Sequence, residues 1–388
     1  MAGARLRVVF GYDPKANAAM PASLSERGPR IDSIPPRTGD ILPRKMTVIL
    51  RVNSLAPEPE ALRTAADILR AGGLVAFPTE TVYGLGAHAL DHEAVARIFA
   101  AKGRPATNPL IVHVPNADAA QALTSRWPAR AERLASRFWP GPLTLVLPKS
   151  PRVPDSVTAS LPSVALRIPS HPIALALLNE AGIPVAAPSA NRFTQLSPTT
   201  AAHVEASLGS AVDLILDGGP TNVGIESTVV DLTGEHPLLL RPGAVTREEL
   251  ATALGTAVLD PAVAPADNAP RLSPGMHALH YAPRAMLFVF SAGSRRQAEV
   301  NARDEVASEG RVGALLLASS DRFAAPLHRR ITMPADATSY ARELYLRLHE
   351  LDDAGCTLII VESPPAGGEW EGIHDRLRRA SSTPGSAH

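Results

Sequence analysis

Short apolar runs that alternate with amphipathic stretches are the feature that most limits how this chain can fold. Runs such as residues 110–114 and 143–147 have the length of strands, whereas residues 57–71 repeat their apolar positions with the period of a helix. Strands and helices that alternate along a chain usually build an α/β domain. The pattern therefore predicts such a domain over residues 46–256.

The remaining sequence divides into an extension, a linker and a second folded unit. Residues 1–45 scatter Pro, Gly, Ser, Arg and Asp without a period, so we expect a poorly ordered extension. Residues 257–284 are rich in Ala, Pro and Asp, as linkers are, although they include His280 and Tyr281. Residues 285–388 again alternate strands with helices and predict a smaller α/β domain.

Residues 77–86 read Phe-Pro-Thr-Glu-Thr-Val-Tyr-Gly-Leu-Gly and follow an apolar run. This order predicts a buried strand that ends in a polar loop. Glycines let a ligand approach the backbone closely, and sites in open α/β sheets lie beyond the strand ends. The stretch alone is equally compatible with a ligand-binding loop and with an ordinary strand-to-helix connection. Farther along, residues 116–138 predict one helix.

The bulk composition restricts the classes of function. The formal net charge is zero, so no overall basic field indicates nucleic-acid binding. Cys356 is the single cysteine, which excludes an internal disulfide and a cysteine-based zinc site. No stretch has the roughly 18 uninterrupted apolar residues of a membrane span, and no signal-peptide core opens the chain. We therefore expect a cytoplasmic protein, with Met1 or Met46 as its translation start.

Four cationic side chains stand at strand ends or in loops shaped by Gly and Pro, namely Lys102, Arg104, Arg167 and Arg241. Arg167 and Arg241 each interrupt an apolar strand beside a proline, which is unusual for a solvated surface charge. Nucleoside triphosphates need several such donors around their phosphates. The sequence holds no Walker-type phosphate loop, dinucleotide-binding fingerprint or metalloprotease motif. Four separate surface charges remain the alternative at this point.

Small polar side chains flank several predicted strands in turn-forming sequence: Ser189, Asn191, Ser197, Ser227 and Thr228. They suit phosphate oxygens, a ribose or a polar substrate, and they suit turn formation and helix capping equally well. His113 ends a predicted strand, where a histidine is more often structural than catalytic.

Several of these motifs together resemble the YrdC-like domain family over residues 55–250: 77–86, 102–110, 189–191 and 224–231. The His280-Tyr281-Ala282-Pro283 run, followed by a small α/β unit, resembles the two-domain threonylcarbamoyl-AMP synthases. The resemblance implies a twisted open sheet with flanking helices around a concave, positively lined pocket, with the linker as a lid. It also implies a second, Rossmann-like domain.

The same resemblance implies an activity and its residues. L-threonine, bicarbonate and ATP would give threonylcarbamoyl-AMP and pyrophosphate, and partner proteins would pass the threonylcarbamoyl group to tRNA. Mg²⁺ would enter with ATP, since no acidic metal cluster is evident in the sequence. Lys102 and Arg104 would be catalytic. The implied threonine contacts are Thr81, His113, Arg167, Ala187 and Ser227, and the implied ATP contacts are Lys102, Arg104, Asn108, Ser163, Ser189, Asn191, Ser197, Arg241 and Tyr281.

Two alternatives accompany this hypothesis. A YrdC-like module that binds RNA without nucleotidyl transfer is disfavoured by the neutral charge and by an aromatic content of only 4%. A carbamoyl transferase of the hydrogenase-maturation type would need cysteines that this chain lacks. The sequence leaves open whether the protein contacts tRNA directly and whether it prefers threonine to serine.

Overall fold

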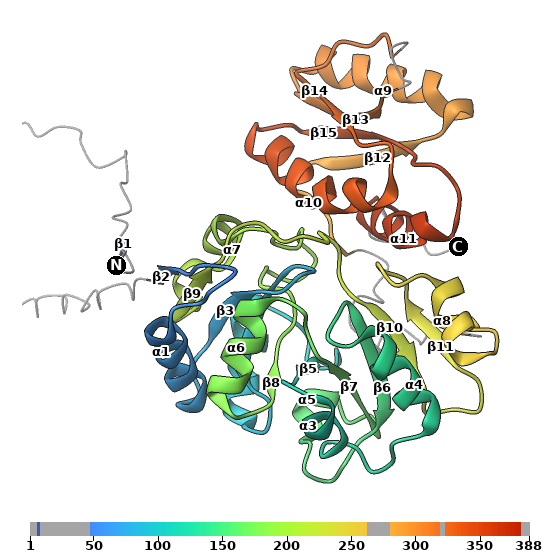
Figure 1. Ribbon diagram of the computed structural model, residues 1–388. Coiled ribbons are helices and arrows are strands. Elements are labelled where there is room, and N and C mark those ends of the chain that lie inside the picture. Colours follow the sequence, from blue (N-terminus) through green and yellow to red (C-terminus); the bar gives the residue numbers. More distant parts are fainter. Residues whose placement is uncertain (1–5, 8–46, 262–279, 319–322, 382–388) are drawn as a thin grey trace, which may run out of the picture.

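The computed structural model describes residues 6–7, 47–261, 280–318 and 323–381, which form two α/β units (Figure 1). The predicted α/β class is confirmed: a large mixed sheet with flanking helices builds the first unit, and a second sheet builds the smaller unit. Most of the predicted extension 1–45 lies outside the described residues, and its Leu6–Arg7 pairs as a short strand with residues 49–50. Residues 262–279 of the predicted linker also lie outside them.

The larger unit is organised around an 11-stranded sheet with the order β1-β2-β9-β3-β4-β8-β5-β7-β6-β10-β11. The strands are β1 (Leu6–Arg7), β2 (Val48–Arg51), β3 (Val75–Pro78), β4 (Tyr83–His88), β5 (Ile111–His113), β6 (Leu143–Pro148), β7 (Ser163–Arg167), β8 (Val185–Ala186), β9 (Leu214–Asp217), β10 (Thr228–Asp231) and β11 (Leu238–Arg241). The helices are α1 (Pro59–Arg70), α2 (His92–Lys102), α3 (Ala117–Gln121), α4 (Ala129–Phe138), α5 (Asp155–Thr158), α6 (Pro172–Ala181), α7 (Ala201–Leu208) and α8 (Arg247–Leu254).

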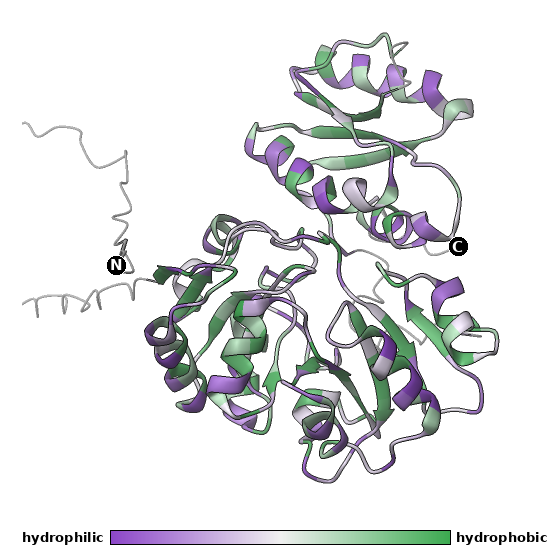
Figure 2. Cartoon of the chain, viewed as in Figure 1, coloured by the Kyte–Doolittle hydropathy of each residue, from purple (hydrophilic) through white to green (hydrophobic). Residues whose placement is uncertain are grey.

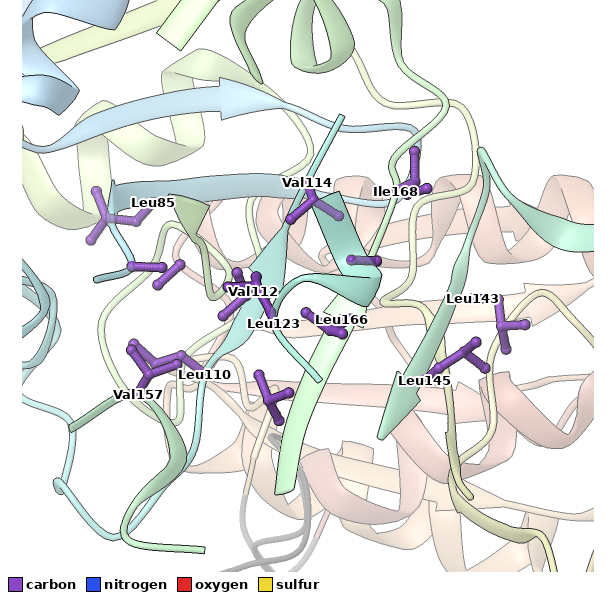
Figure 3. Packing of buried hydrophobic residues seen from close by; sticks show 14 of the residues in the cluster. Leu85, Leu110, Val112, Val114, Leu123, Leu143, Leu145, Val157, Leu166 and Ile168 are labelled. Atoms are coloured by element: carbon purple, nitrogen blue, oxygen red, sulfur yellow. The ribbon is translucent and has the colours of Figure 1, made fainter. Parts of the chain in front are cut away.

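Aliphatic side chains on both faces of this sheet hold the helices in place. Leu85, Val112 and Leu166 belong to one cluster and are at most 1% exposed (Figure 3). On the other face, α1 and α6 pack against each other and bury residues such as Leu69 and Leu177. Figure 2 shows the same division, with apolar strands inside and polar helix surfaces outside. Each fully buried side chain of this kind contributes roughly 1.5–3 kcal/mol.

Two sequence-based element predictions need correction. Residues 79–82 form the polar turn predicted after the buried strand, but the expected loop is shorter than residues 77–86. Residues 83–88 are strand β4, which pairs antiparallel with β3, and this excludes the strand-to-helix alternative. The single helix predicted over 116–138 is two helices, α3 and α4, because Pro128 precedes α4 with extended backbone.

The smaller unit has four parallel strands in the order β12-β15-β13-β14. Its elements are β12 (Met286–Phe290), α9 (Arg295–Ala307), β13 (Val312–Leu317), β14 (Arg329–Met333), α10 (Ala337–Asp353), β15 (Leu358–Glu362) and α11 (Glu371–Ala380). Helix α9 covers one face, and α10 and α11 lie between the other face and the larger unit (Figure 1). None of the helices in the described part of the chain is long and apolar enough to cross a membrane.

Candidate active site

A hollow of about 520 Å³, measured to its open mouth, lies where the β3–β4 turn, several strand ends and the end of the linker meet. Its walls come from segments far apart in the sequence: Thr79, Thr81, Val82, Gly84, Arg104, Ile111, His113, Arg167, Ala187, Pro188, Ser189, Glu226, Arg241, His280 and Tyr281. The fold therefore brings together polar residues that are far apart in the sequence.

The β3–β4 turn presents an oriented hydroxyl to the hollow. The Thr79 hydroxyl donates to the Val82 carbonyl at 2.7 Å and lies 2.8 Å from the Thr81 hydroxyl. Because Thr79 has only one hydroxyl proton, Thr81 must be the donor of this pair. The Thr81 hydroxyl, 0% exposed, therefore offers only its lone pairs to a ligand, which makes it an acceptor for an N–H group.

Arg167 is a buried cation whose ion pair with Glu80 uses only one of its terminal nitrogens. Its Nη2 donates to Oε1 of Glu80 at 2.7 Å, and its Nε donates to the Gly141 carbonyl at 3.3 Å. The remaining terminal nitrogen, Nη1, has no partner among the described residues. An anion such as a carboxylate suits this vacant side of the guanidinium fork.

His113 stands beside Arg167 because the two residues are register partners in the parallel pair of β5 and β7. Burial, with a smaller contribution from the Arg167 charge, lowers the pKa of His113 to about 3. Its Nδ1 is buried and has no hydrogen-bond partner among the described residues. The imidazole is thus neutral near pH 7 and retains unused hydrogen-bonding capacity next to the hollow.

Two further arginines, Arg104 and Arg241, make part of the wall cationic. Burial lowers the pKa of Arg104 to about 10, and burial also lowers the pKa of Arg241. Arg104 donates to the Pro109 carbonyl at 3.1 Å, and Arg241 donates to the carbonyl and hydroxyl of Ser227 at 2.9 and 3.0 Å. The neutral carbonyl that Arg104 contacts does not cancel its charge, so this guanidinium favours an anionic ligand.

Lys102 does not line the hollow. Its Nζ donates to the carbonyl of Ser189 at 2.6 Å and to the carbonyl of Asn191, and burial holds its pKa well below the usual range. Lys102 thereby fixes the loop that brings Ser189 to the hollow. Lys102 therefore has a structural role in this loop as well as a positive charge.

The structure brings eight of the predicted site residues to the hollow: Thr81, Arg104, His113, Arg167, Ala187, Ser189, Arg241 and Tyr281. The others do not line it: Lys102, Asn108, Ser163, Asn191, Ser197 and Ser227. Ser163 begins β7, four residues before Arg167, which places it about 13 Å away at ~3.3 Å per residue. The amide of Asn191 donates at 2.8 Å to the carbonyls of Arg192 and Gln195 and so shapes the turn.

The end of the linker closes the hollow from one side. Tyr281 is 1% exposed and His280 is 5% exposed, and both line the hollow. The neighbouring Ala282 donates its N–H to the Thr194 carbonyl at 2.8 Å, which ties the linker to the larger unit. His280 and Tyr281 can therefore both pack the linker against the larger unit and contact a ligand in the hollow.

Glu226 is a lining residue that sequence reasoning missed. Its carboxylate accepts from the Ser197 hydroxyl, from Nε of Arg376 at 2.7 Å and from the Tyr345 hydroxyl at 3.1 Å. The position of Glu226 directly before Ser227 was the only available signal. Among the described residues, no group of three or more His, Cys, Asp or Glu side chains could hold a metal ion.

Comparisons with known proteins agree with this geometry. A family model described as "Telomere recombination" matches residues 67–243, and one described as "Threonylcarbamoyl-AMP synthase, C-terminal domain" matches residues 245–382. The chain is 43% identical over 340 residues to a threonylcarbamoyl-AMP synthase of Pyrococcus abyssi, covering 87% of this chain and 98% of that protein. It is 40% identical over 331 residues to a threonylcarbamoyl-AMP synthase of Bacillus subtilis, covering 85% and 95%.

A solved structure shows the same fold. The crystal structure of Pyrococcus abyssi Sua5 complexed with L-threonine superposes with a TM-score of 0.80 at 42% identity, covering 86% of this chain and 98% of that one.

Proposed function

The chain belongs to the threonylcarbamoyl-AMP synthase family, and we propose that its hollow is where L-threonine, bicarbonate and ATP are combined. The protein is an enzyme of tRNA modification that makes threonylcarbamoyl-AMP, a nucleotidyl transfer. The resemblance stated from sequence motifs is thus confirmed. What the following paragraphs add is how the residues of this chain would divide the work.

The wall formed by Thr81, His113 and Arg167 suits the amino acid. The vacant Nη1 of Arg167 would bind the threonine carboxylate, and the lone pairs of Thr81 would accept from its amine. The backbone at Ala187 closes the same end of the hollow. A relative solved as a complex with L-threonine supports threonine as the amino acid. Ser227 would act from behind, through its hydrogen bond to Arg241.

The cationic wall suits the triphosphate. Arg104 and Arg241 would contact phosphate oxygens, Ser189 would add a hydroxyl, and Tyr281 would cover the bound nucleotide. Lys102, Asn191 and Ser197 would support this wall from the second layer. Asn108 and Ser163 were also predicted to contact ATP, but neither residue lines the hollow.

The chemistry joins the two walls. The threonine amine and bicarbonate give a carbamate and water; a carbamate oxygen then attacks the α-phosphorus of ATP, and pyrophosphate leaves. The attacking group and the phosphates are both anionic, so catalysis here is mainly positioning and charge neutralisation. Arg104 and Arg241 would supply that neutralisation, while Arg167 holds the amino acid. Tyr281 would exclude water from a labile carbamate.

Mg²⁺ would arrive with ATP, held by phosphate oxygens. Glu226 is the carboxylate that lines the hollow, and its oxygens already accept from Ser197, Tyr345 and Arg376. It is therefore a poor metal ligand, and the described residues fit a metal that the substrate carries. We further propose a cytoplasmic location and a downstream partner that takes up the product for tRNA.

One observation supports this division most: three arginines from separate parts of the chain, Arg104, Arg167 and Arg241, line one hollow. The cover that the buried Tyr281 provides argues against the RNA-binding alternative. The test is pyrophosphate release from ATP–Mg²⁺, with threonine, bicarbonate or both left out, and with serine in place of threonine. Release that needs both co-substrates supports the proposal, and release without threonine contradicts it.

A further inference from the structure

Glu80 is a buried carboxylate of the β3–β4 turn that does not line the hollow but holds a residue that does. Its Oε1 accepts from Nη2 of Arg167 at 2.7 Å, and its Oε2 accepts from the backbone N–H of Ser170 at 3.0 Å. Arg167 is the last residue of β7, and Ser170 follows it closely in the chain. One side chain therefore ties the turn to the end of the strand that carries Arg167.

This ion pair also fixes the plane of the Arg167 guanidinium. Nε and Nη2 lie along one edge of the planar group, and they donate to the Gly141 carbonyl at 3.3 Å and to Glu80 at 2.7 Å. These contacts use two of its five N–H donors. The donors that remain, on Nη1 and on Nη2, share the other edge and suit a bidentate carboxylate. Since Arg167 lines the hollow, Glu80 sets the direction in which this edge points.

The turn that contains Glu80 is held by its backbone as well. The Glu80 carbonyl accepts from the N–H of Val223 at 2.7 Å. The Thr81 carbonyl accepts from the N–H of Gly224 at 3.0 Å. Thr81 follows Glu80 directly, and its buried hydroxyl lines the same hollow as Arg167. Glu80 is thus covalently joined to one polar contact of the hollow and ion-paired with another.

The spacing of these two contacts matters to an amino-acid ligand. An α-amino acid carries its amine and its carboxylate on one carbon atom, so the distance between its two polar ends varies little. The Thr81 hydroxyl offers lone pairs to the amine, and the open edge of Arg167 offers donors to the carboxylate. Both contacts form at once only if the turn and the strand end keep one separation.

We propose that Glu80 is a positioning residue for the amino-acid substrate, because it sets the separation and direction of Thr81 and Arg167. The inference rests on the proposed function, since it takes the ligand to be an α-amino acid whose carboxylate meets Arg167. It gives the acidic residue of the turn a part in binding although the ligand does not touch it.

Charge and geometry give opposite signs when Glu80 is changed. The Glu80 carboxylate offsets the charge of Arg167 and repels a second carboxylate, so its removal would tighten threonine binding if charge dominated. Its removal also leaves the guanidinium with only the 3.3 Å contact to Gly141, which frees the plane and weakens bidentate binding. The inference states that the loss of geometry outweighs the gain in charge.

The test measures dissociation constants for the full chain by calorimetry, along with thermal unfolding. The ligands are L-threonine, L-threoninamide, which has a neutral amide in place of the carboxylate, and ATP–Mg²⁺. The variants are Glu80→Gln, which keeps the length, and Glu80→Asp, which keeps the charge. Glu299→Gln is the matched control, because Glu299 also accepts a backbone N–H, from Ala324 at 3.1 Å, and pairs with Arg303 at 3.5 Å, but in the smaller unit.

We expect Glu80→Gln to weaken threonine binding about tenfold or more, as for other lost buried charge contacts. Threoninamide and ATP–Mg²⁺ should bind within about twofold of the wild type, because neither depends on the oriented fork. The preference of the protein for threonine over threoninamide should therefore collapse. Glu80→Asp should restore part of it, since aspartate keeps the charge and both acceptor oxygens. A merely structural role would weaken all three ligands together.

Two results overturn the inference: threonine binding in Glu80→Gln as tight as in the wild type or tighter, or an equal loss for threonine and threoninamide. Should Glu80→Gln fail to fold, Glu80→Asp decides. A loss of about threefold or more for threonine alone supports the inference, and any other result with Glu80→Asp overturns it. Failure of the inference alone leaves the wild-type preference for threonine intact. A wild type without that preference refutes the proposed carboxylate contact of Arg167, and the inference with it.

Discussion

His113 and Arg167 stand side by side because β5 and β7 pair in parallel with these two residues in register. Both side chains are buried, with 3% exposure each, and both line the hollow. The charge of Arg167 helps to keep the imidazole of His113 neutral. A neutral hydrogen-bonding ring beside a guanidinium whose ion pair uses only one terminal nitrogen is a pair suited to one amino-acid ligand.

The first prediction concerns Arg167. Arg167→Gln should lower kcat/KM for threonine by about 30-fold to several thousandfold (~2–5 kcal/mol), because a buried charge contact to the carboxylate is lost. Arg167→Lys should lose less, since it keeps the charge without the fork. Steady-state pyrophosphate release at varied threonine measures both. Arg51→Gln, at an arginine with a side chain 82% exposed, is the control, and full activity in Arg167→Gln would remove Arg167 from the threonine site.

The second prediction concerns acid stability. The pKa of His113 is lowered to about 3 in the fold, while an unfolded histidine titrates near 6.5. Between these values the unfolded chain binds the extra proton, so the free energy of unfolding falls as the pH drops from 6.5 toward 3. The slope from this one group is at most about 1.4 kcal/mol per pH unit.

Urea unfolding at pH 7 and pH 5 tests this claim. His113→Gln should lose less stability on acidification than the wild type does. Burial lowers the pKa of His203 to about 3 as well, so His203→Gln is the matched comparison and should show a change of the same sign. An unchanged pH dependence in His113→Gln would mean that its imidazole is not held neutral by the fold.

The third prediction is a trade between stability and activity at Arg104. This buried guanidinium has a lowered pKa, which means that its charge is costly in the ligand-free protein. Arg104→Met should raise the free energy of unfolding by about 1 kcal/mol or more and weaken ATP binding, with threonine binding kept. Thermal unfolding and calorimetry measure these effects. Exposed Arg133→Met should change neither, and a destabilised Arg104→Met with normal ATP affinity would contradict the account.

The fourth prediction concerns the domain junction. Gly224 has φ +82°, and a Cβ there would meet Ala341 and Arg342 of the smaller domain at 2.4–2.7 Å. Gly224→Ala should therefore cost more than the roughly 1 kcal/mol of a backbone effect alone, and it should lower activity as well. Gly255→Ala is matched, with φ +69° and nothing within 4 Å. Equal losses of unfolding free energy in the two variants would show that the domains do not press together here.

Much of the site was predictable because its residues break a local pattern. Arg167 and Arg241 end strands that are otherwise apolar, and a charge in that setting points to a buried partner or a ligand. Most strands were predictable from short apolar runs bounded by turn residues, because run length can be read without tertiary contacts. The split of residues 116–138 into two helices was harder to predict, because Pro128 interrupts a sequence that otherwise favours one helix.

The second domain's share of the site was not predictable. Arg376 stands in a run with Arg378 and Arg379, which has the appearance of a solvated helix face. Only the docking of α11 on the larger domain buries Arg376 against Glu226. Likewise, Lys102 was expected to face the ligand, yet its ammonium finds two backbone carbonyls nearer at hand. Such choices depend on distances that no single sequence reveals.

The central claim is that the amino acid and the triphosphate bind to different residues of one hollow. A crystal structure of the full chain with L-threonine, Mg²⁺ and a non-hydrolysable ATP analogue tests it most directly. The account predicts the threonine carboxylate at hydrogen-bond distance from Arg167 and the phosphates at Arg104 and Arg241. Threonine or phosphates bound away from these side chains would contradict it.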